Sequence, residues 1–133
     1  MNITIIQSTE SACESRIRDH HLRCDRPIEK DGGNAGPMGG EYFLMGLGGC
    51  FTSNLLAAIK ARNANVSNVA VDIAATLSEN PARFSKIEIE VSAQHEDREL
   101  MEKLLIIAER GCIIVNTLKD SVELSVSLSG TPA

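Results

Sequence analysis

The stretch "EYFLMGLGGCFTSNLLAAIKARN", from Glu41 to Asn63, decides the fold of this 133-residue chain. Its apolar side chains recur at steps of three and four residues, a spacing that predicts a helix. Charge stands only near its ends, with Glu41 early and Lys60 and Arg62 late, which suits the helix dipole. Because so little of the helix surface is polar, we expect it to be buried near the centre of the structure.

Three glycines, Gly46, Gly48 and Gly49, crowd into the part of this helix that precedes Cys50. Each costs a helix interior about 1 kcal/mol relative to alanine. Glycine is typical of positions where a second backbone or a ligand must come close. A lone helical cysteine is more often a small core hydrophobe than a reactive group. The glycines make a purely structural role for Cys50 less favoured, since they indicate that a substrate or a second backbone can approach the Cys50 thiol.

Segments in which polar and apolar residues alternate lie on both sides of the helix and predict strands. A second helix is expected over 97–110, ended by Gly111, with a short helical or turn segment after it. A glycine-rich loop, Lys30 to Gly40, precedes the first helix. The order ββ-α-ββ-α-β predicts one α+β domain over residues 1–133, with antiparallel sheets around a long central helix. The expected strands are 2–9, 15–25, 69–78, 84–95 and 122–130.

Composition narrows the classes of function. The net charge is −5 and aromatic residues make up 3%, so a nucleic-acid partner is not expected. No uninterrupted apolar run approaches the ~20 residues of a membrane span, and the N-terminus lacks the features of a signal peptide. We therefore expect a cytoplasmic protein with no membrane partner.

The chain has four cysteines, Cys13, Cys24, Cys50 and Cys112. None forms a C-x-x-C pair, which removes the usual support for zinc-ribbon and thioredoxin-type sites. In a reducing cytoplasm a bond between two of them is expected to be transient and chemically active rather than structural. Cys112 follows a glycine at the end of a helix. If a helical turn restarts there, its N–H groups favour a thiolate at Cys112. A buried cysteine at the boundary of two elements is the other interpretation, and for Cys112 taken alone it is the preferred one.

Metal and cofactor sites find little support. His20 and His21 lie near Cys13 and Cys24 in the sequence, but adjacent residues on a strand point to opposite faces, so both histidines do not readily bind one metal. The glycine-rich loop is not a P-loop, because no Lys-Ser/Thr pair follows it, and no G-x-S-x-G motif is present. We expect neither a metal nor a bound cofactor.

The stretch "DRPIEKDGGNAGPMGGEYFLMGLGGCFTSNLLAAIKARN" (Asp25–Asn63), together with "RGCIIVNTLKDSVELSVSL" (Arg110–Leu128), resembles the OsmC/Ohr family, the OsmC-like and organic hydroperoxide resistance proteins. That family carries a glycine-rich loop, a Glu-x-x-Leu helix entry and a first cysteine within the helix. A second cysteine follows about sixty residues later, in a C-P-x-S-N context. Cys50 and Cys112 stand at a similar separation here.

The resemblance implies an OsmC-like fold, an intertwined homodimer with active sites at its interface, and a thiol peroxidase that reduces organic hydroperoxides, in some members also hydrogen peroxide. By resemblance, Cys50 is the peroxidatic thiolate that becomes a sulfenic acid. Cys112 is the resolving thiol that closes a disulfide. An external dithiol reductant, such as a lipoylated protein, then reopens it.

Two departures from the family pattern concern the neighbours of the cysteines. The best-characterised peroxidases have an active-site glutamate ten residues before the first cysteine, where this chain has Gly40. Glu41, one position later, is the candidate for that role, and it is also explained as a partner of the helix dipole. Ile113 replaces the usual proline after the second cysteine.

The arginine that pairs with the thiolate in the family has no clear counterpart. The preferred candidate is Arg16, because it lies closest to the expected turn between the first two strands. The other candidates are Arg18, Arg23 and Arg26.

Two alternatives to a peroxidase remain open. A non-enzymatic OsmC-like redox sensor or a protein that binds a small apolar ligand would leave the Cys50 pKa near the ordinary value of about 8.5. An interaction module with purely structural cysteines would form no internal disulfide on oxidation. Cys13 and Cys24 receive no role from the sequence.

Overall fold

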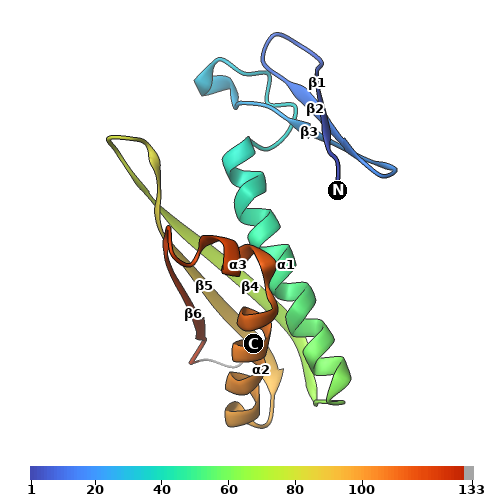
Figure 1. Ribbon diagram of the computed structural model, residues 1–133, viewed down its shortest axis with the longest axis vertical. Helices are drawn as coiled ribbons and strands as arrows, with labels where there is room; N and C mark the ends of the chain where they lie inside the picture. The colour runs from blue at the N-terminus through green and yellow to red at the C-terminus, as the bar shows by residue number, and fades with distance from the viewer. Residues whose placement is uncertain (131–133) are drawn as a thin grey trace. The chain divides into compact units, whose positions relative to one another are not determined.

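The computed structural model describes residues 1–130 (Figure 1). The chain forms two compact units, one over Met1–Met45 and one from Gly46 onward, and α1 runs through their boundary. The single-domain prediction over residues 1–133 stays a prediction. The elements, in chain order, are β1 (Thr4–Gln7), β2 (Cys13–Ile17), β3 (His20–Cys24), the 3-10 helix η1 (Ile28–Lys30), α1 (Gly39–Ala61), β4 (Val66–Ser78), β5 (Arg83–His95), α2 (Arg98–Gly111), α3 (Ile113–Leu118) and β6 (Glu123–Leu128).

The first unit is built on an antiparallel sheet in the order β1-β2-β3. The prediction of one strand over 15–25 is wrong, because the chain turns back after Ile17 and forms a hairpin. Arg18 makes the turn with a positive φ of 51°. The turn residues are Arg18 and Asp19, and four polar residues, Arg18 to His21, interrupt the alternation between Ile17 and Leu22. Asp is a residue type that turns favour, so the sequence carried a weak sign of the turn that the prediction passed over.

A buried carboxylate organises the loop between β3 and α1. Asp25 is 3% exposed. Its Oδ2 accepts hydrogen bonds from the backbone N–H groups of Gly33 (3.1 Å) and Ala35 (3.0 Å). Its Oδ1 accepts one from Arg26 N–H at 2.7 Å. These hydrogen bonds stabilise the buried carboxylate of Asp25 and fix the conformation of the glycine-rich loop.

The second unit is built on a sheet in the order β4-β5-β6. β4 and β5 pair antiparallel, as expected, whereas β5 and β6 pair parallel. The prediction of purely antiparallel sheets is therefore wrong for β6. The physical reason is the crossover through α2 and α3, which returns the chain to the end of the sheet where β5 began. The α+β class itself is confirmed.

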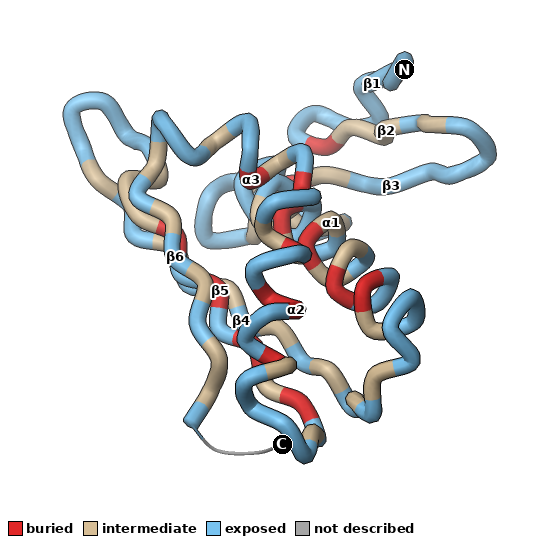
Figure 2. The backbone as a smooth tube through the Cα atoms, turned by 60° about the horizontal axis from the view of Figure 1, so that its bottom comes forward, coloured by how far each residue is buried: buried red, intermediate tan, exposed pale blue. Residues whose placement is uncertain are grey.

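The core of the second unit lies between its sheet and two helices, α1 and α2 (Figure 2). β5 supplies every second residue, as expected for a strand with one buried face. The helices supply residues at steps of three and four. The buried apolar residues of these elements are Leu47, Phe51, Leu55 and Ala58 in α1, Ile87, Ile89, Val91 and Ala93 in β5, and Met101, Leu104, Leu105 and Ala108 in α2.

α1 is less buried than its apolar sequence predicts. Leu56 is 50% exposed, and only 28% of the most apolar 18-residue stretch of the helix is buried. By length and composition alone α1 could cross a membrane, a test that core helices also pass. The prediction that α1 is buried is thus wrong for the isolated chain. The other elements of the second unit cover only one stripe of the helix, which holds Leu47, Phe51, Leu55 and Ala58.

Candidate active site

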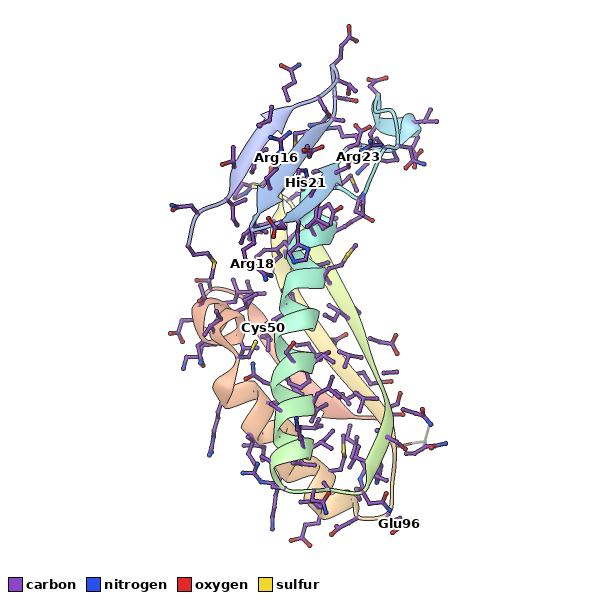
Figure 3. All side chains as sticks on the ribbon, turned by 90° about the vertical axis from the view of Figure 1, so that its right-hand side faces the viewer. Arg16, Arg18, His21, Arg23, Cys50 and Glu96 are labelled. Carbon is purple, nitrogen blue, oxygen red and sulfur yellow. The ribbon has the colours of Figure 1, made fainter. Side chains whose placement is uncertain are left out.

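Two thiols meet in the second unit. Cys50 lies on α1 (Figure 3). Cys112 lies at the junction of α2 and α3. The Cys112 S–H donates to Cys50 Sγ across 3.2 Å, and both cysteines are free. Cys50 is half-buried, whereas Cys112 is 0% exposed. The structure thus brings together the two cysteines that the resemblance singles out.

The α2–α3 junction sets the position of Cys112. α2 ends at Gly111, and Cys112 is extended (φ −81°, ψ 113°) as the N-cap of α3. A Cβ added at Gly111 would lie 3.3 Å from Asn54 Oδ1, which is tight contact. Glycine at this position therefore lets the junction approach α1 closely. The sequence expectation that Gly111 ends the second helix and that a helical turn restarts after it is confirmed.

The surroundings of Cys50 favour its thiolate. Burial alone raises the pKa of the Cys50 thiol. The hydrogen bond from Cys112 and the bonds from the backbone N–H groups of Ile114 and Ile113 lower it by more. The net result is a Cys50 pKa below the usual value for cysteine, because all three donors stabilise the negative sulfur.

Cys112 is shifted in the opposite direction. Burial is the largest cause that raises the pKa of Cys112, and the hydrogen bond and negative charge of Cys50 raise it further. The N–H groups of Val115 and Ile114 act against this rise without overcoming it. The structure therefore agrees with the interpretation of Cys112 as a buried cysteine at an element boundary, and it does not favour a thiolate there. A helical turn does restart there, but Cys112 is fully buried and the negative charge is favoured on Cys50.

Asn54 is a neighbour of the thiol that the sequence analysis missed. It lies one helical turn after Cys50 on α1. Its side-chain Nδ2 donates to the Cys50 carbonyl at 3.0 Å and stands 3.9 Å from Cys50 Sγ. The i,i+4 spacing of the two residues was the signal available, since such residues face each other on a helix.

The glycines before Cys50 differ in what they face. A Cβ added at Gly48 would lie 2.6 Å from Ile73 Cδ1 on β4, so Gly48 permits close packing of α1 on the sheet. A Cβ at Gly46 would stand 3.9 Å from Ile114 Cδ1 on α3. Gly49 has no atom within 4 Å of its added Cβ. The space left by the missing side chain is thus occupied by β4 at Gly48 and is open at Gly49.

Glu41 and Arg16, the other predicted site residues, lie in the first unit. Glu41 Oε1 accepts a hydrogen bond from Met38 N–H at 2.8 Å, which satisfies one free donor at the start of α1. Arg16 lies on β2, where its Nε contacts Glu14 Oε1 at 2.7 Å on the exposed sheet (Figure 3). Each has a local partner, and their catalytic roles stay predictions.

Among residues 1–130, no group of three or more His, Cys, Asp and Glu side chains could hold a metal ion. His21 Nδ1 instead lies 3.0 Å from Glu14 Oε1. An open cleft of about 580 Å³ lies in the first unit beside Glu41. Its wall includes Pro27, Lys30 and Met45.

Comparison with protein families gives one match. The sequence model of the OsmC-like protein family matches residues 32–127, a range that holds Cys50, Cys112 and Glu41 but not Arg16. A comparison with curated proteins finds no match.

Solved structures with the same fold are numerous. An OsmC-like protein from Mycoplasma pneumoniae superposes with a TM-score of 0.85 at 16% identity, covering 96% of this chain and 94% of its own. An organic hydroperoxide resistance protein OsmC from Legionella pneumophila gives 0.76 at 17%, covering 96% and 95%. The organic hydroperoxide resistance protein OhrB of Bacillus subtilis gives 0.70 at 18%, covering 96% of each chain. At these identities the likeness shows the shared fold.

Proposed function

The chain belongs to the OsmC-like protein family, and on that premise we propose that it is a thiol-dependent peroxidase that reduces organic hydroperoxides. The observation that carries the proposal is the 3.2 Å separation between Cys50 Sγ and Cys112 Sγ. The opposite pKa shifts of the two thiols support it, because they favour Cys50 as the nucleophile and Cys112 as the second thiol. The Legionella and Bacillus proteins of the same fold are described as organic hydroperoxide resistance proteins, which agrees with a peroxide-related role.

In the first step the Cys50 thiolate attacks the terminal oxygen of the hydroperoxide. A sulfur–oxygen bond forms, the oxygen–oxygen bond breaks, and the alkoxide leaves and takes a proton from water to become the alcohol. Cys50 is thereby oxidised by two electrons to a sulfenic acid, and the hydroperoxide is reduced by the same two electrons. Cys50 is half-buried and not fully buried, which supports access of a hydroperoxide to this residue.

In the second step the Cys112 sulfur attacks the sulfenic sulfur of Cys50. A disulfide forms, and the hydroxyl leaves with the Cys112 proton as water. Since a disulfide spans about 2.05 Å, the two sulfurs must approach by only about 1 Å. A dithiol then reopens the disulfide by two successive exchanges. A lipoylated protein is a reductant of this class, and no bound cofactor is needed.

The proposal includes a homodimer, and hydrogen peroxide as a second substrate. The exposed apolar side chains of α1 support the dimer, since Met45 is 53% and Leu56 is 50% exposed. Apolar surface of this kind is typical of subunit interfaces. Dependence on a dithiol reductant suits the cytoplasm, where thiols are kept reduced.

The test is turnover of cumene hydroperoxide by the purified chain with dihydrolipoamide as reductant. We expect the wild type to consume the hydroperoxide catalytically and Cys50→Ser to abolish consumption. Cys112→Ser keeps the first step, so we expect its Cys50 to be trapped as the sulfenic acid by dimedone. Cys13→Ser serves as the matched control and should turn over as the wild type does.

Equal inactivity of the wild type and Cys50→Ser would overturn the proposal. If hydroperoxide instead forms the Cys50–Cys112 disulfide once per chain and the dithiol supports no turnover, a redox sensor is the better description. The same Cys50–Cys112 contact makes a redox sensor the second candidate function and favours it over a protein that binds an apolar ligand.

A further inference from the structure

A second pair of thiols lies in the first unit. Cys13 on β2 and Cys24 on β3 are directly opposite each other in the antiparallel register. Both are free and half-buried. Opposite residues of antiparallel strands have Cα atoms about 4.5–5.5 Å apart and side chains on one face of the sheet. A disulfide requires Cα atoms about 4.4–6.8 Å apart, so the Cα spacing of this register lies within the range of a disulfide.

The two side chains already interact. Burial is the largest cause that raises the pKa of Cys24, and the charge and hydrogen bond of Cys13 raise it further. The Gly39 N–H, at the first residue of α1, donates to the Cys24 sulfur. The pair is therefore in contact, and it sits where the hairpin meets the start of α1. The first unit holds no other cysteine that could compete for either thiol.

We propose that Cys13 and Cys24 form a second dithiol–disulfide pair, separate from the Cys50–Cys112 site, that exchanges with low-molecular-weight disulfides such as oxidised glutathione. This proposal goes beyond the peroxidase and does not rest on it. The carrying observation is the direct cross-strand opposition of the two thiols.

The exchange balances in two steps. One cysteine of the pair, as thiolate, attacks the small disulfide, forms a mixed disulfide and releases one small thiol. The other cysteine attacks the protein-side sulfur and releases the second small thiol. Two protein thiols lose two electrons and two protons, and the small disulfide gains both.

The disulfide would act as a clamp on the hairpin. The turn at Arg18 closes one end of β2 and β3, and the pair Cys13–Cys24 stands at the other, open end. Asp25, which anchors the following loop, is the next residue along the chain. Oxidation would join the strands covalently at the point where this loop begins, and reduction would release them.

The experiment equilibrates the full chain in glutathione buffers of increasing oxidised fraction, quenches with acid, alkylates and digests with trypsin. Cleavage after Arg16, Arg23 and Lys30 places the two cysteines on separate peptides. We expect a linked pair, peptide 1–16 joined to peptide 24–30, with a mass lower by two hydrogens than the sum of the free peptides. The linked pair should disappear in reducing buffers.

Two variants separate this proposal from the peroxidase. In Cys50→Ser/Cys112→Ser the linked pair should form over the same range of buffers, although this variant has no peroxidase site. In Cys24→Ser the linkage is lost, and Cys13 should carry a single glutathione. The proposal is overturned if, in the wild type, Cys13 and Cys24 stay free or each carry glutathione in buffers that fully oxidise Cys50 and Cys112.

Discussion

At the scale of the residue, the two cysteines of the candidate site look alike in the sequence and differ in their chemistry. Cys50 and Cys112 each follow a glycine. Surrounding groups make them unequal, since donors converge on Cys50 while burial keeps Cys112 a thiol. An attacking thiolate and a protonated second thiol are what a peroxide-reducing cycle requires. The difference in pKa between the two thiols therefore comes from the groups around them.

The first prediction concerns this difference in pKa between Cys50 and Cys112. Cys112→Ala removes the S–H that donates to Cys50, so the pKa of Cys50 should rise. Because the pKa of Cys50 is lowered in the wild type, its thiolate should persist below the ordinary cysteine pKa, and we expect Cys50 to be alkylated there. In the variant the rate profile should move to higher pH, with about a tenfold slower rate at pH 7 for each pKa unit gained. Mass spectrometry of the Cys50 peptide measures the rate at each pH. Cys13→Ala is the control, and an unmoved profile in Cys112→Ala contradicts the assignment.

The second prediction concerns Asn54. Asn54→Asp places a carboxylate where Nδ2 now stands 3.9 Å from Cys50 Sγ. A negative charge so near disfavours the thiolate, so alkylation of Cys50 at pH 7 should slow several-fold and the pKa should rise. Asn63→Asp introduces the same charge just beyond the end of α1, more than two helical turns after Cys50, and is the matched control. Equal rates in the two variants would show that Asn54 does not act on the thiol.

At the scale of the element, α1 contains glycines with different surroundings. Gly49 has open space where a Cβ would be, whereas a Cβ at Gly48 meets Ile73 on β4. We therefore expect Gly49→Ala to raise the free energy of unfolding by about 0.5–1 kcal/mol, from helix propensity alone. Gly48→Ala should gain less, because Ile73 must move. Urea denaturation measures both. A gain at Gly48 equal to that at Gly49 would show that β4 does not pack closely there, and a loss at Gly49 would show that something covers it.

Most elements follow from local pattern, and the exceptions have physical causes. The long helix, the second helix, its end at Gly111 and the long strands β4 and β5 match the predicted segments closely. The hairpin turn at Arg18 and Asp19 was missed because it contains no glycine or proline, and the weaker signals, Asp19 and the four polar residues from Arg18 to His21, were passed over. The parallel pairing of β6 was missed because strand direction depends on where a crossover returns, and no residue of β6 encodes that.

At the scale of the whole molecule, α1 leaves apolar surface uncovered, and a second copy of the chain is the proposed cover. Leu56→Glu puts a charge on a side chain of α1 that is 50% exposed. If that surface is buried in a homodimer, desolvation of the charge should shift the protein to monomers. Sedimentation velocity at micromolar concentration measures this change.

The control for this prediction is Leu77→Glu. Leu77 lies on β4 and is 69% exposed. It should leave the dimer intact, because it adds the same charge to an exposed position on β4 and not to the apolar surface of α1. A wild type that sediments as a monomer, or an equal effect of both variants, contradicts a dimer built on α1.

The candidate site was predictable in part. Cys50 and Cys112 were identified by resemblance, and the structure brings their sulfurs together. Asn54 was within reach of the i,i+4 rule and was overlooked. The backbone donors from Ile113 and Ile114 were not predictable as partners of Cys50, because they come from an element more than sixty residues away.

The sequence by itself determined the α+β class, the long apolar helix, and the family, since periodicity and motif spacing are local properties that need no neighbours. Only the tertiary structure decided which groups lower the pKa of Cys50 and raise that of Cys112, which glycine is in close contact, and that Cys13 stands opposite Cys24. The physical reason is that pKa, packing and cross-strand register depend on groups that are distant in the chain and meet only when it folds. The glycines before Cys50 illustrate both what the sequence determines and what only the fold determines. Their place is visible in the sequence, and what each of them faces is visible only in the fold.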